Sequence, residues 1–314
     1  MKKFLSISLI LLLSIVIGIT LFVKASWNST SALLNTNASL SFTDLFDTNR
    51  ANTNTTPDTL LAPAPFDGWK FVVIGDTEDG GPVLDRFISD MKQRSDITFI
   101  AHVGDIVSHG DTDLMKTVKS QFSELPIPTY YVPGNNDLIY NEKTERKTLE
   151  HYAAVFGSPA YQAVTVQNAQ LFFLDNSYLR IGFADDELAW LKKTLDDSSP
   201  QYRFLFFHRP LNVPGQEIFG DDETPNSRIQ NTKFLTLLSN YHIDRIFNGH
   251  IHTSLNYTLT AGDTTIPVTV SGGGGAYPQA ILGGEAAAYF HYLVVTVPNE
   301  PQKTPHIQIV KLSE

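Results

Sequence analysis

Two histidines stand one residue apart in the segment Gly-His-Ile-His, residues 249–252. Side chains two positions apart in a strand lie on the same face, so His250 and His252 can point their imidazoles at one place. Imidazole nitrogen is a common ligand of divalent transition metals. Because a surface strand can carry two histidines by chance, the meaning of the pair depends on the other residues of the chain.

Polar side chains that can bind a metal ion also follow four other predicted strands. These groups are Asp76, Glu78 and Asp79 after strand 70–75, Asp105 after strand 97–104, Asn135, Asn136 and Asp137 after strand 129–134, and His208 at the end of strand 202–208. A single Asp or Asn in such a place usually caps a helix or completes a turn. In open α/β sheets, however, ligands bind at the carboxyl ends of the strands. Five strands that deliver such side chains therefore predict one shared site.

Strands and helices alternate along residues 70–250, which predicts the α/β fold class. Helical spacing of apolar residues extends over 83–93, 113–125, 144–156, 185–197 and 231–241, and a further buried strand covers 170–176. After residue 253 the pattern is all β, with segments 254–260, 265–272, 289–297 and 306–312. These four segments predict a second sheet or the far half of a sandwich.

The composition excludes several kinds of function. The 314 residues include no cysteine, so disulfides, zinc–thiolate sites and thiol nucleophiles are excluded. A metal ion must then be held by His, Asp, Glu, Asn or main-chain oxygen. The formal net charge of -10 does not suit a protein that holds nucleic acid by its phosphates, which requires a basic face. We therefore expect no nucleic-acid partner.

The N-terminal part of the chain differs from the rest. Two lysines precede the apolar run Phe4–Val23, which is as long as the roughly 20 residues that span a membrane. Ala25, before a serine, resembles a cleavage site, so residues 1–25 are predicted to be a signal peptide or an N-terminal membrane anchor. Residues 26–65 are rich in Asn, Thr and Ser and are predicted to be a flexible linker. The remainder, 66–314, is expected to be secreted or anchored to the cytoplasmic membrane facing outside.

The order and spacing of the motifs resemble those of the calcineurin-like metallophosphoesterases. The motifs are GDTED (75–79), GDIVSHG (104–110), GNND (134–137), HRP (208–210) and GHIH (249–252), and SGGGGAYP (271–278) resembles the glycine-rich segment after the last metal motif in extracytoplasmic members. The resemblance covers residues 69–275. It implies a four-layer αββα sandwich for residues 66–314. It also implies hydrolysis of phosphomonoesters or phosphodiesters, either in a small molecule or as an exposed phosphoester.

The resemblance further implies two divalent metal ions that share the carboxylate of Asp105. The expected ligands are Asp76, Asp105 and His252 for one ion, with Glu78 as a further candidate, and Asp105, Asn135, His208 and His250 for the other. Mixed nitrogen and oxygen ligands suit Mn, Fe, Zn, Co or Ni better than Ca. A dinuclear centre of this kind activates a water for in-line attack on phosphorus.

Two positions depart from the family pattern. Glu78 replaces the histidine of the Asp-x-His motif, and it either ligates a hard cation or points away, with Asp79 as a nearby alternative. Asn136 replaces a histidine that helps to stabilise the phosphate and protonates the leaving oxygen, and an amide cannot supply a proton at neutral pH. His109 is a candidate replacement, and Arg209 is a candidate phosphate clamp. The expected catalytic residues are thus Asn136, Asp105, His109 and Arg209.

The departure at Asn136 leaves a second interpretation open, in which the protein is a catalytically weak metal-binding surface protein that recognises a ligand. A third interpretation is a glycosidase that uses the paired carboxylates Asp221 and Asp222. It is the least favoured, because such an acidic run is more typical of a solvated loop.

Overall fold

The computed structural model describes residues 67–178, 181–214, 225–280 and 284–313. All of these residues belong to one compact unit, Pro63–Glu314. The predicted signal peptide or anchor, the predicted linker and the acidic pair Asp221 and Asp222 lie outside the described residues. Among the helices that are described, none is long and apolar enough to cross a membrane.

The first of two large sheets has the strand order β13-β12-β1-β2-β3. Its strands are β1 (Gly68–Ile74), β2 (Ile97–His102), β3 (Thr129–Tyr131), β12 (His291–Pro298) and β13 (His306–Lys311). β1, β2 and β3 run parallel, whereas β12 pairs antiparallel with both β1 and β13. The carboxyl ends of the three parallel strands therefore lie at one edge of the sheet.

The second sheet has the order β10-β11-β9-β8-β7-β6. Its strands are β6 (Gln162–Val166), β7 (Ala169–Phe173), β8 (Tyr202–Phe206), β9 (Arg245–Asn248), β10 (Ser254–Ala261) and β11 (Thr264–Ser271). β7, β8, β9 and β11 run parallel, and β6 and β10 are antiparallel edge strands. His208 and the histidine pair follow β8 and β9, two neighbouring parallel strands.

Three apolar clusters define the layers. Phe71 of β1 and Phe206 of β8 lie in the cluster between the two sheets, with ring centroids 5.9 Å apart. Val72 points to the opposite face of β1, toward α2 and α3, as the two-residue period of a strand requires. The outer face of the second sheet packs under α5 and α6. The fold is therefore the expected four-layer αββα sandwich.

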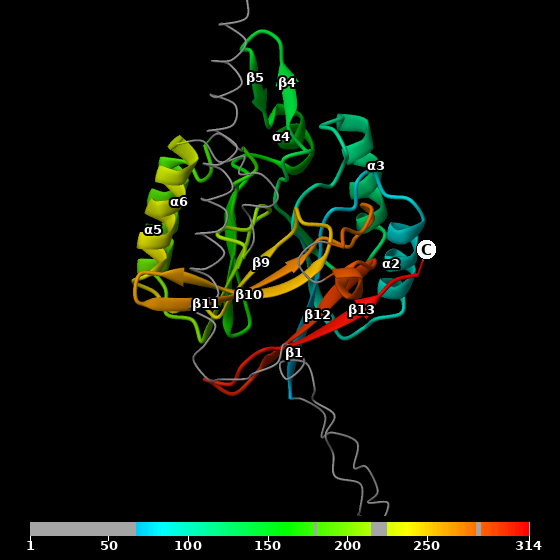
Figure 1. Cartoon of the computed structure of the whole chain (residues 1–314). Coiled ribbons are helices and arrows are strands. Elements are labelled where there is room, and N and C mark those ends of the chain that lie inside the picture. Colours follow the sequence, from blue (N-terminus) through cyan, green and yellow to red (C-terminus); the bar gives the residue numbers. More distant parts are fainter. Residues whose placement is uncertain (1–66, 179–180, 215–224, 281–283, 314) are drawn as a thin grey trace, which may run out of the picture. The chain divides into compact units, whose positions relative to one another are not determined.

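The helices cover the outer faces of both sheets, with α5 and α6 together on one flank and α2 and α3 on the other (Figure 1). They are α2 (Pro82–Lys92), α3 (Thr112–Ser123), α4 (Glu150–Phe156), α5 (Asp185–Asp196) and α6 (Pro225–Leu238), with a short 3-10 helix, η2, at Gly284–Ala287. Asp111 begins α3 as an N-cap, since its carboxylate accepts hydrogen bonds from the backbone N–H groups of Asp113 and Leu114.

The C-terminal strands differ from the prediction, because they do not form a sheet of their own. β10 and β11 extend the second sheet beside β9, whereas β12 and β13 complete the first sheet beside β1. Alternating apolar residues show that a strand is buried, but they do not show which strand it pairs with. The chain crosses from one sheet to the other after β11, at the glycine-rich segment.

The predicted helix 144–156 is also wrong in its first part. Residues 146–148 form β5 (Arg146–Thr148), which pairs with β4 (Ile139–Asn141) in a hairpin, and only Glu150–Phe156 is helical. The Asn141 side-chain oxygen accepts hydrogen bonds from the N–H groups of Lys143 and Thr144. Such a local side-chain turn competes with helix formation, and apolar spacing alone does not reveal it.

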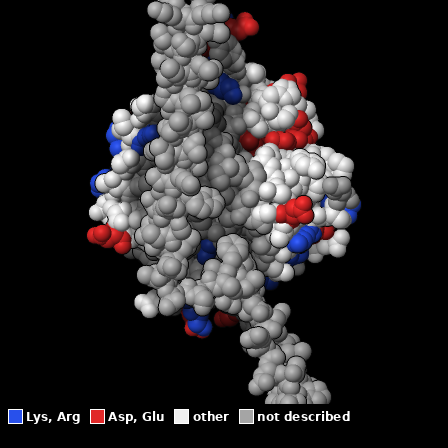
Figure 2. Space-filling model, in the orientation of Figure 1, with Lys and Arg blue, Asp and Glu red and all other residues white. Residues whose placement is uncertain are grey.

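Charged side chains of both signs are scattered over the described surface on the face in Figure 2. On this face, the described part of the chain shows no continuous area of Lys and Arg.

Candidate metal centre

The residues after the central strands have an unusual backbone conformation in common. Nine non-glycine residues of the described chain have positive φ, and five of them are in the strand-end motifs: Asp76, Glu78, Asp79, Asp105 and His250, with φ between 37° and 73°. A non-glycine residue in this region costs on the order of 1–3 kcal/mol, and such residues cluster at functional sites. The surrounding hydrogen bonds must therefore hold these side chains in place.

Two motif glycines are required because a ligand-type carboxylate lies directly against them. A Cβ atom on Gly134 would lie 2.1 Å from the backbone nitrogen and Oδ1 of Asp105. A Cβ on Gly249 would lie 2.5 Å from Oδ2 of Asp76. Gly134 thus lets the loop after β3 approach Asp105, and Gly249 lets the loop after β9 approach Asp76.

One compact group consists of Asp105, His208 and His250, whose ligand atoms lie within 4.8 Å of one another. The His208 Nε2 atom is 3.3 Å from Asp105 Oδ2 and 3.1 Å from the Asn135 side-chain oxygen. The other ring nitrogen of His208 donates to the backbone oxygen of Val103 at 2.9 Å. This hydrogen bond fixes the tautomer and turns Nε2 toward the carboxylate, as is usual for histidines that ligate metals.

A second group lies next to the first, on the β1 side. The His252 Nε2 atom is 3.7 Å from Asp76 Oδ1 and 3.7 Å from Glu78 Oε1. Both Asp76 carboxylate oxygens accept a hydrogen bond from the backbone N–H of His250 at 3.0 Å. The ring of His252 also hydrogen-bonds to the backbone of Tyr277. The two histidines of the GHIH segment therefore face different carboxylates.

The pKa values of the carboxyl and imidazole groups in the site depend on their burial and on the charges of neighbouring side chains. Burial, reinforced by the charge of Asp105, raises the pKa of Asp76 and of Glu78. Burial lowers the pKa of His250 to about 3 and also lowers that of His252, so both imidazoles are neutral at pH 7. Burial acts against the charge of His208, but the nearby Asp105 carboxylate outweighs it and raises the His208 pKa to about 9. A metal ligand must give up its proton, so a cation bound here would displace the proton of His208 and favour the ionised carboxylates.

Glu78 and Asn136, the two departures from the family pattern, face each other. The Asn136 side-chain amide donates to Glu78 Oε1 at 3.4 Å. The backbone N–H of Asn136 donates to Asp105 Oδ1 at 2.8 Å. Glu78 thus points into the site rather than away from it.

Asp79 and His109 lie further out on the GDTED and GDIVSHG loops. The Asp79 carboxylate accepts hydrogen bonds from the backbone N–H and the hydroxyl of Ser108, so it holds the two loops together. His109 is exposed, and its ring Nδ1 hydrogen-bonds to the Ser108 hydroxyl at 2.9 Å. Its catalytic role remains a prediction.

Arg209 is buried beside the centre, and its positive charge acts on His250. Asn176, three residues after the end of β7, makes two hydrogen bonds with the backbone of Arg209. Its amide oxygen accepts from the Arg209 N–H at 3.0 Å, and its amide nitrogen donates to the Arg209 carbonyl at 2.7 Å. The sequence reasoning missed Asn176. Its place after a buried strand, like that of the other site residues, was the available signal.

Asp137 is a second residue whose role the sequence reasoning missed. It is fully buried, and its carboxylate accepts hydrogen bonds from the backbone N–H groups of Ile106, Val107 and Gly134. One side chain therefore fixes the loop after β2 to the loop after β3. Burial, followed by the charge of Asp105, raises the Asp137 pKa to about 8.

We expect Asp137→Ala to lower the free energy of unfolding by about 3 kcal/mol, because three buried N–H donors lose their acceptor. Urea denaturation followed by circular dichroism measures this loss. Asp137→Asn is the matched control, since it keeps an acceptor oxygen and is expected to lose less. Equal stability of the wild type and Asp137→Ala would contradict this role.

The glycine-rich segment joins the loops of the two sheets. Gly274 N–H donates to the Gly75 carbonyl at 2.9 Å, and Ala276 N–H donates to the Asp76 carbonyl at 2.8 Å. Three residues on, Gln279 N–H donates to the His252 carbonyl at 2.7 Å. Through these bonds the segment fixes Asp76 relative to His252.

Comparison with solved structures shows the same fold. Purple acid phosphatase PPD1 from yellow lupin (Lupinus luteus) seeds superposes with a TM-score of 0.59 and 16% identity, over 80% of this chain and 52% of that protein. GAP50, the anchor in the inner membrane complex of Plasmodium, superposes with a TM-score of 0.53 and 14% identity, over 79% of this chain and 90% of that protein.

Comparison of sequences gives a more specific result. The probable glycerophosphodiester phosphodiesterase GpdQ of Arcobacter nitrofigilis is 26% identical over 171 residues, which are 52% of this chain and 59% of that relative. This chain thus spans little more than half the length of its curated relative. The calcineurin-like phosphoesterase family matches residues 70–254, from β1 to the start of β10. Since this match covers more than half of the chain and all five strand-end motifs, the chain belongs to the calcineurin-like phosphoesterase family.

Proposed function

We propose that this protein is a metal-dependent phosphoesterase that hydrolyses phosphomonoesters or phosphodiesters at the carboxyl ends of β1, β2, β3, β8 and β9. The observation that carries the proposal is the convergence of Asp105, His208 and His250 within 4.8 Å, beside a second carboxylate–imidazole group around His252. The name of the GpdQ relative supports a phosphodiester as one substrate class.

The donor set fits two divalent cations of the Mn, Fe, Zn, Co or Ni type. The proposed ligands are Asp105, Asn135, His208 and His250 for one ion, and Asp76, Glu78, Asp105 and His252 for the other. The position of Asp105 between the two groups supports a bridging role. Glu78 in place of an imidazole shifts the second site toward a harder cation.

Two such ions, when bound, neutralise phosphoryl oxygens and activate a water for in-line attack. The residues of this chain complete the site. Arg209 is placed to balance the negative charge of the phosphate, with its backbone held by Asn176. Asn136 can donate a hydrogen bond to a phosphoryl oxygen, but it cannot protonate the leaving oxygen. We therefore propose that the enzyme prefers esters whose leaving group departs without a proton, such as phenolates.

We further propose that the protein acts outside the cytoplasm, as a secreted or membrane-anchored enzyme. The apolar run near the N-terminus, preceded by two lysines, supports this location. The substrate is then a small phosphate ester or an exposed phosphoester, rather than nucleic acid.

Asn136 favours one alternative, a protein that binds a metal and a ligand without useful turnover. Turnover of p-nitrophenyl phosphate and bis-p-nitrophenyl phosphate separates the two functions. We expect EDTA to abolish turnover and Mn²⁺ to restore it, with divalent metal measured on the protein at each stage. Metal binding with no release of p-nitrophenolate from either ester would favour the alternative. Turnover that persists after complete removal of metal would contradict the proposed function.

A further inference from the structure

A cavity lies at the β4–β5 hairpin. Its volume is about 850 Å³, and it is lined by Leu138, Thr144, Glu145, Arg146, Lys147, Thr148, Leu149, Tyr178 and Ile181. Pockets of roughly 300–1,000 Å³ are typical for small organic ligands. In Figure 1 the hairpin projects beyond the layers of the sandwich, beside α4.

Two residues that line the cavity are close in sequence to residues of the candidate metal centre. Leu138 is two residues from Asn136, and two residues of extended chain span at most about 7 Å. Tyr178 is likewise two residues from Asn176, which is hydrogen-bonded to the backbone of Arg209. A phosphate held at the metal centre therefore has its organic substituent within reach of the cavity.

The lining is apolar below and carries a net positive charge at the hairpin, where Glu145 precedes Arg146 and Lys147. Leu138, Tyr178 and Ile181 supply apolar surface. Ile181 is 40% exposed and is one of the few large apolar side chains of the described residues that are exposed. Arg146 and Lys147 are exposed, and neither is in an ion pair with any described residue. In a chain of net charge -10, two exposed cations without an ion pair to any described residue attract a second anionic group of a substrate.

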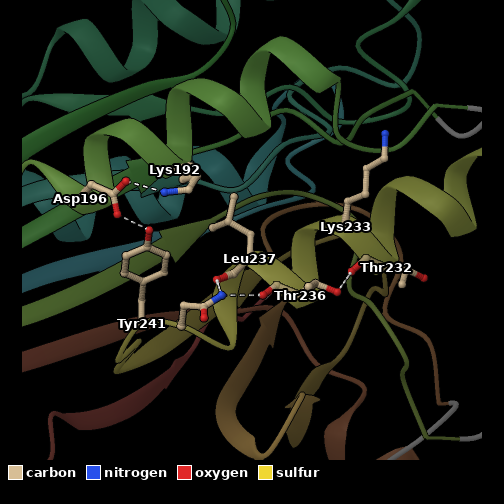
Figure 3. Close-up of a pocket in the computed structure, with 8 residues that line it drawn as sticks. Lys192, Asp196, Thr232, Lys233, Thr236, Leu237 and Tyr241 are labelled. Carbon is tan, nitrogen blue, oxygen red and sulfur yellow. Dashed lines mark hydrogen bonds and ion pairs between the residues drawn. The ribbon is translucent and has the colours of Figure 1, made fainter.

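A second large cavity offers no comparable charge. It lies between α5 and α6, with a volume of about 670 Å³ (Figure 3). Its charged groups are already paired, Lys192 with Asp196 at 2.6 Å and Lys233 with Asp185 at 2.7 Å. Tyr241 also donates to Asp196. The hairpin cavity is therefore the better candidate for ligand recognition.

We infer that the hairpin cavity is the specificity site of the proposed phosphoesterase, and that it takes an apolar or aromatic substituent that carries a second anionic group. This inference rests on the proposed function. The phosphate lies at the metal centre, and the substituent packs against Leu138, Tyr178 and Ile181. Its anionic group pairs with whichever of Arg146 and Lys147 faces the cavity, since successive strand residues point to opposite faces.

Two diesters with the same leaving group test the inference: phenyl p-nitrophenyl phosphate and 4-carboxyphenyl p-nitrophenyl phosphate. We expect the KM of the carboxylated diester to be lower by about 1.5- to fivefold, the range for an exposed ion pair. In Arg146→Ala/Lys147→Ala this preference is lost, while kcat and the KM of the phenyl diester stay unchanged. The preference also falls between 0.05 and 0.5 M NaCl, because salt screens exposed charges.

Lys143→Ala is the matched control, because it removes a cation from the same hairpin but not from the cavity lining. The inference is overturned if the double variant keeps the preference, or if Lys143→Ala loses it equally. If neither diester is hydrolysed, the cavity is judged by calorimetric binding of 4-carboxyphenylphosphonate against phenylphosphonate, and the proposed function fails only if p-nitrophenyl phosphate is not hydrolysed either. Tighter binding of the carboxylated compound to the wild type, lost in the double variant, supports the cavity, and equal binding refutes it.

Discussion

Asp105→Asn is expected to abolish metal-dependent turnover, with a fall in kcat/KM of at least about 100-fold. The carboxylate of Asp105 is 1% exposed and stands between His208 and the backbone N–H of Asn136. Asparagine keeps the shape and one acceptor oxygen but removes the negative charge that two cations would share. Loss of divalent metal, measured by plasma mass spectrometry of the dialysed protein, should accompany the loss of activity.

Asp113→Asn provides the matched control for this substitution. Asp113 is in the first turn of α3, its side chain is 90% exposed, and it pairs with Lys116 on the surface. We expect its metal content and activity to equal those of the wild type. The assignment of Asp105 is wrong if Asp105→Asn, folded by circular dichroism, keeps both its metal and its turnover.

Asn136→His is expected to raise turnover selectively for esters with poor leaving groups. An imidazole at this position can donate a proton to the leaving oxygen, and general acid catalysis contributes about 10²–10⁴-fold. The Asn136 side chain already points toward Glu78, so the new imidazole would lie next to a carboxylate that supports its protonated form. We expect kcat/KM for an alkyl phosphate to rise by about 100-fold, and that for p-nitrophenyl phosphate to change much less.

Measurement of phosphate release from glycerol phosphate, beside p-nitrophenolate release, gives the two rates. Asn136→Gln is the control, since it changes the side-chain length without adding a proton donor of suitable pKa. The double variant Glu78→His/Asn136→His restores the family residues at both positions and should show the largest gain. If Asn136→His raises both rates equally, or neither, leaving-group protonation is not what this site lacks.

The strand-end motifs could be predicted because each depends on local signals. A short buried strand followed by Gly and a polar residue, as at Gly104 and Asp105, requires no knowledge of distant contacts. The resemblance to a family then placed β1, β2, β8 and β9 in one site. The same local reasoning found most helices, such as α5, because apolar spacing is itself local.

The features that were missed depend on pairing between distant segments or on a single side chain. β12 and β1 are more than 200 residues apart in the sequence, and no pattern within either strand predicts that they pair with each other. The hairpin β4–β5 arises where the Asn141 side chain satisfies backbone groups that a helix would otherwise use. Asp137 and Asn176 act on the backbone of other residues, so their types alone do not distinguish them from turn residues.

The chain crosses from the second sheet to the first after β11, and this crossing affects when the candidate metal centre can form. Asp76 gains its backbone partner from Ala276, and β1 lies between β2 and a strand that begins at His291. A nascent chain that has been synthesised through the GHIH segment therefore still lacks the partners that order its first loop. Contacts of such long sequence separation form late and slowly. Competence to capture a cation is thus expected to emerge only after the glycine-rich segment and β12 have docked against β1.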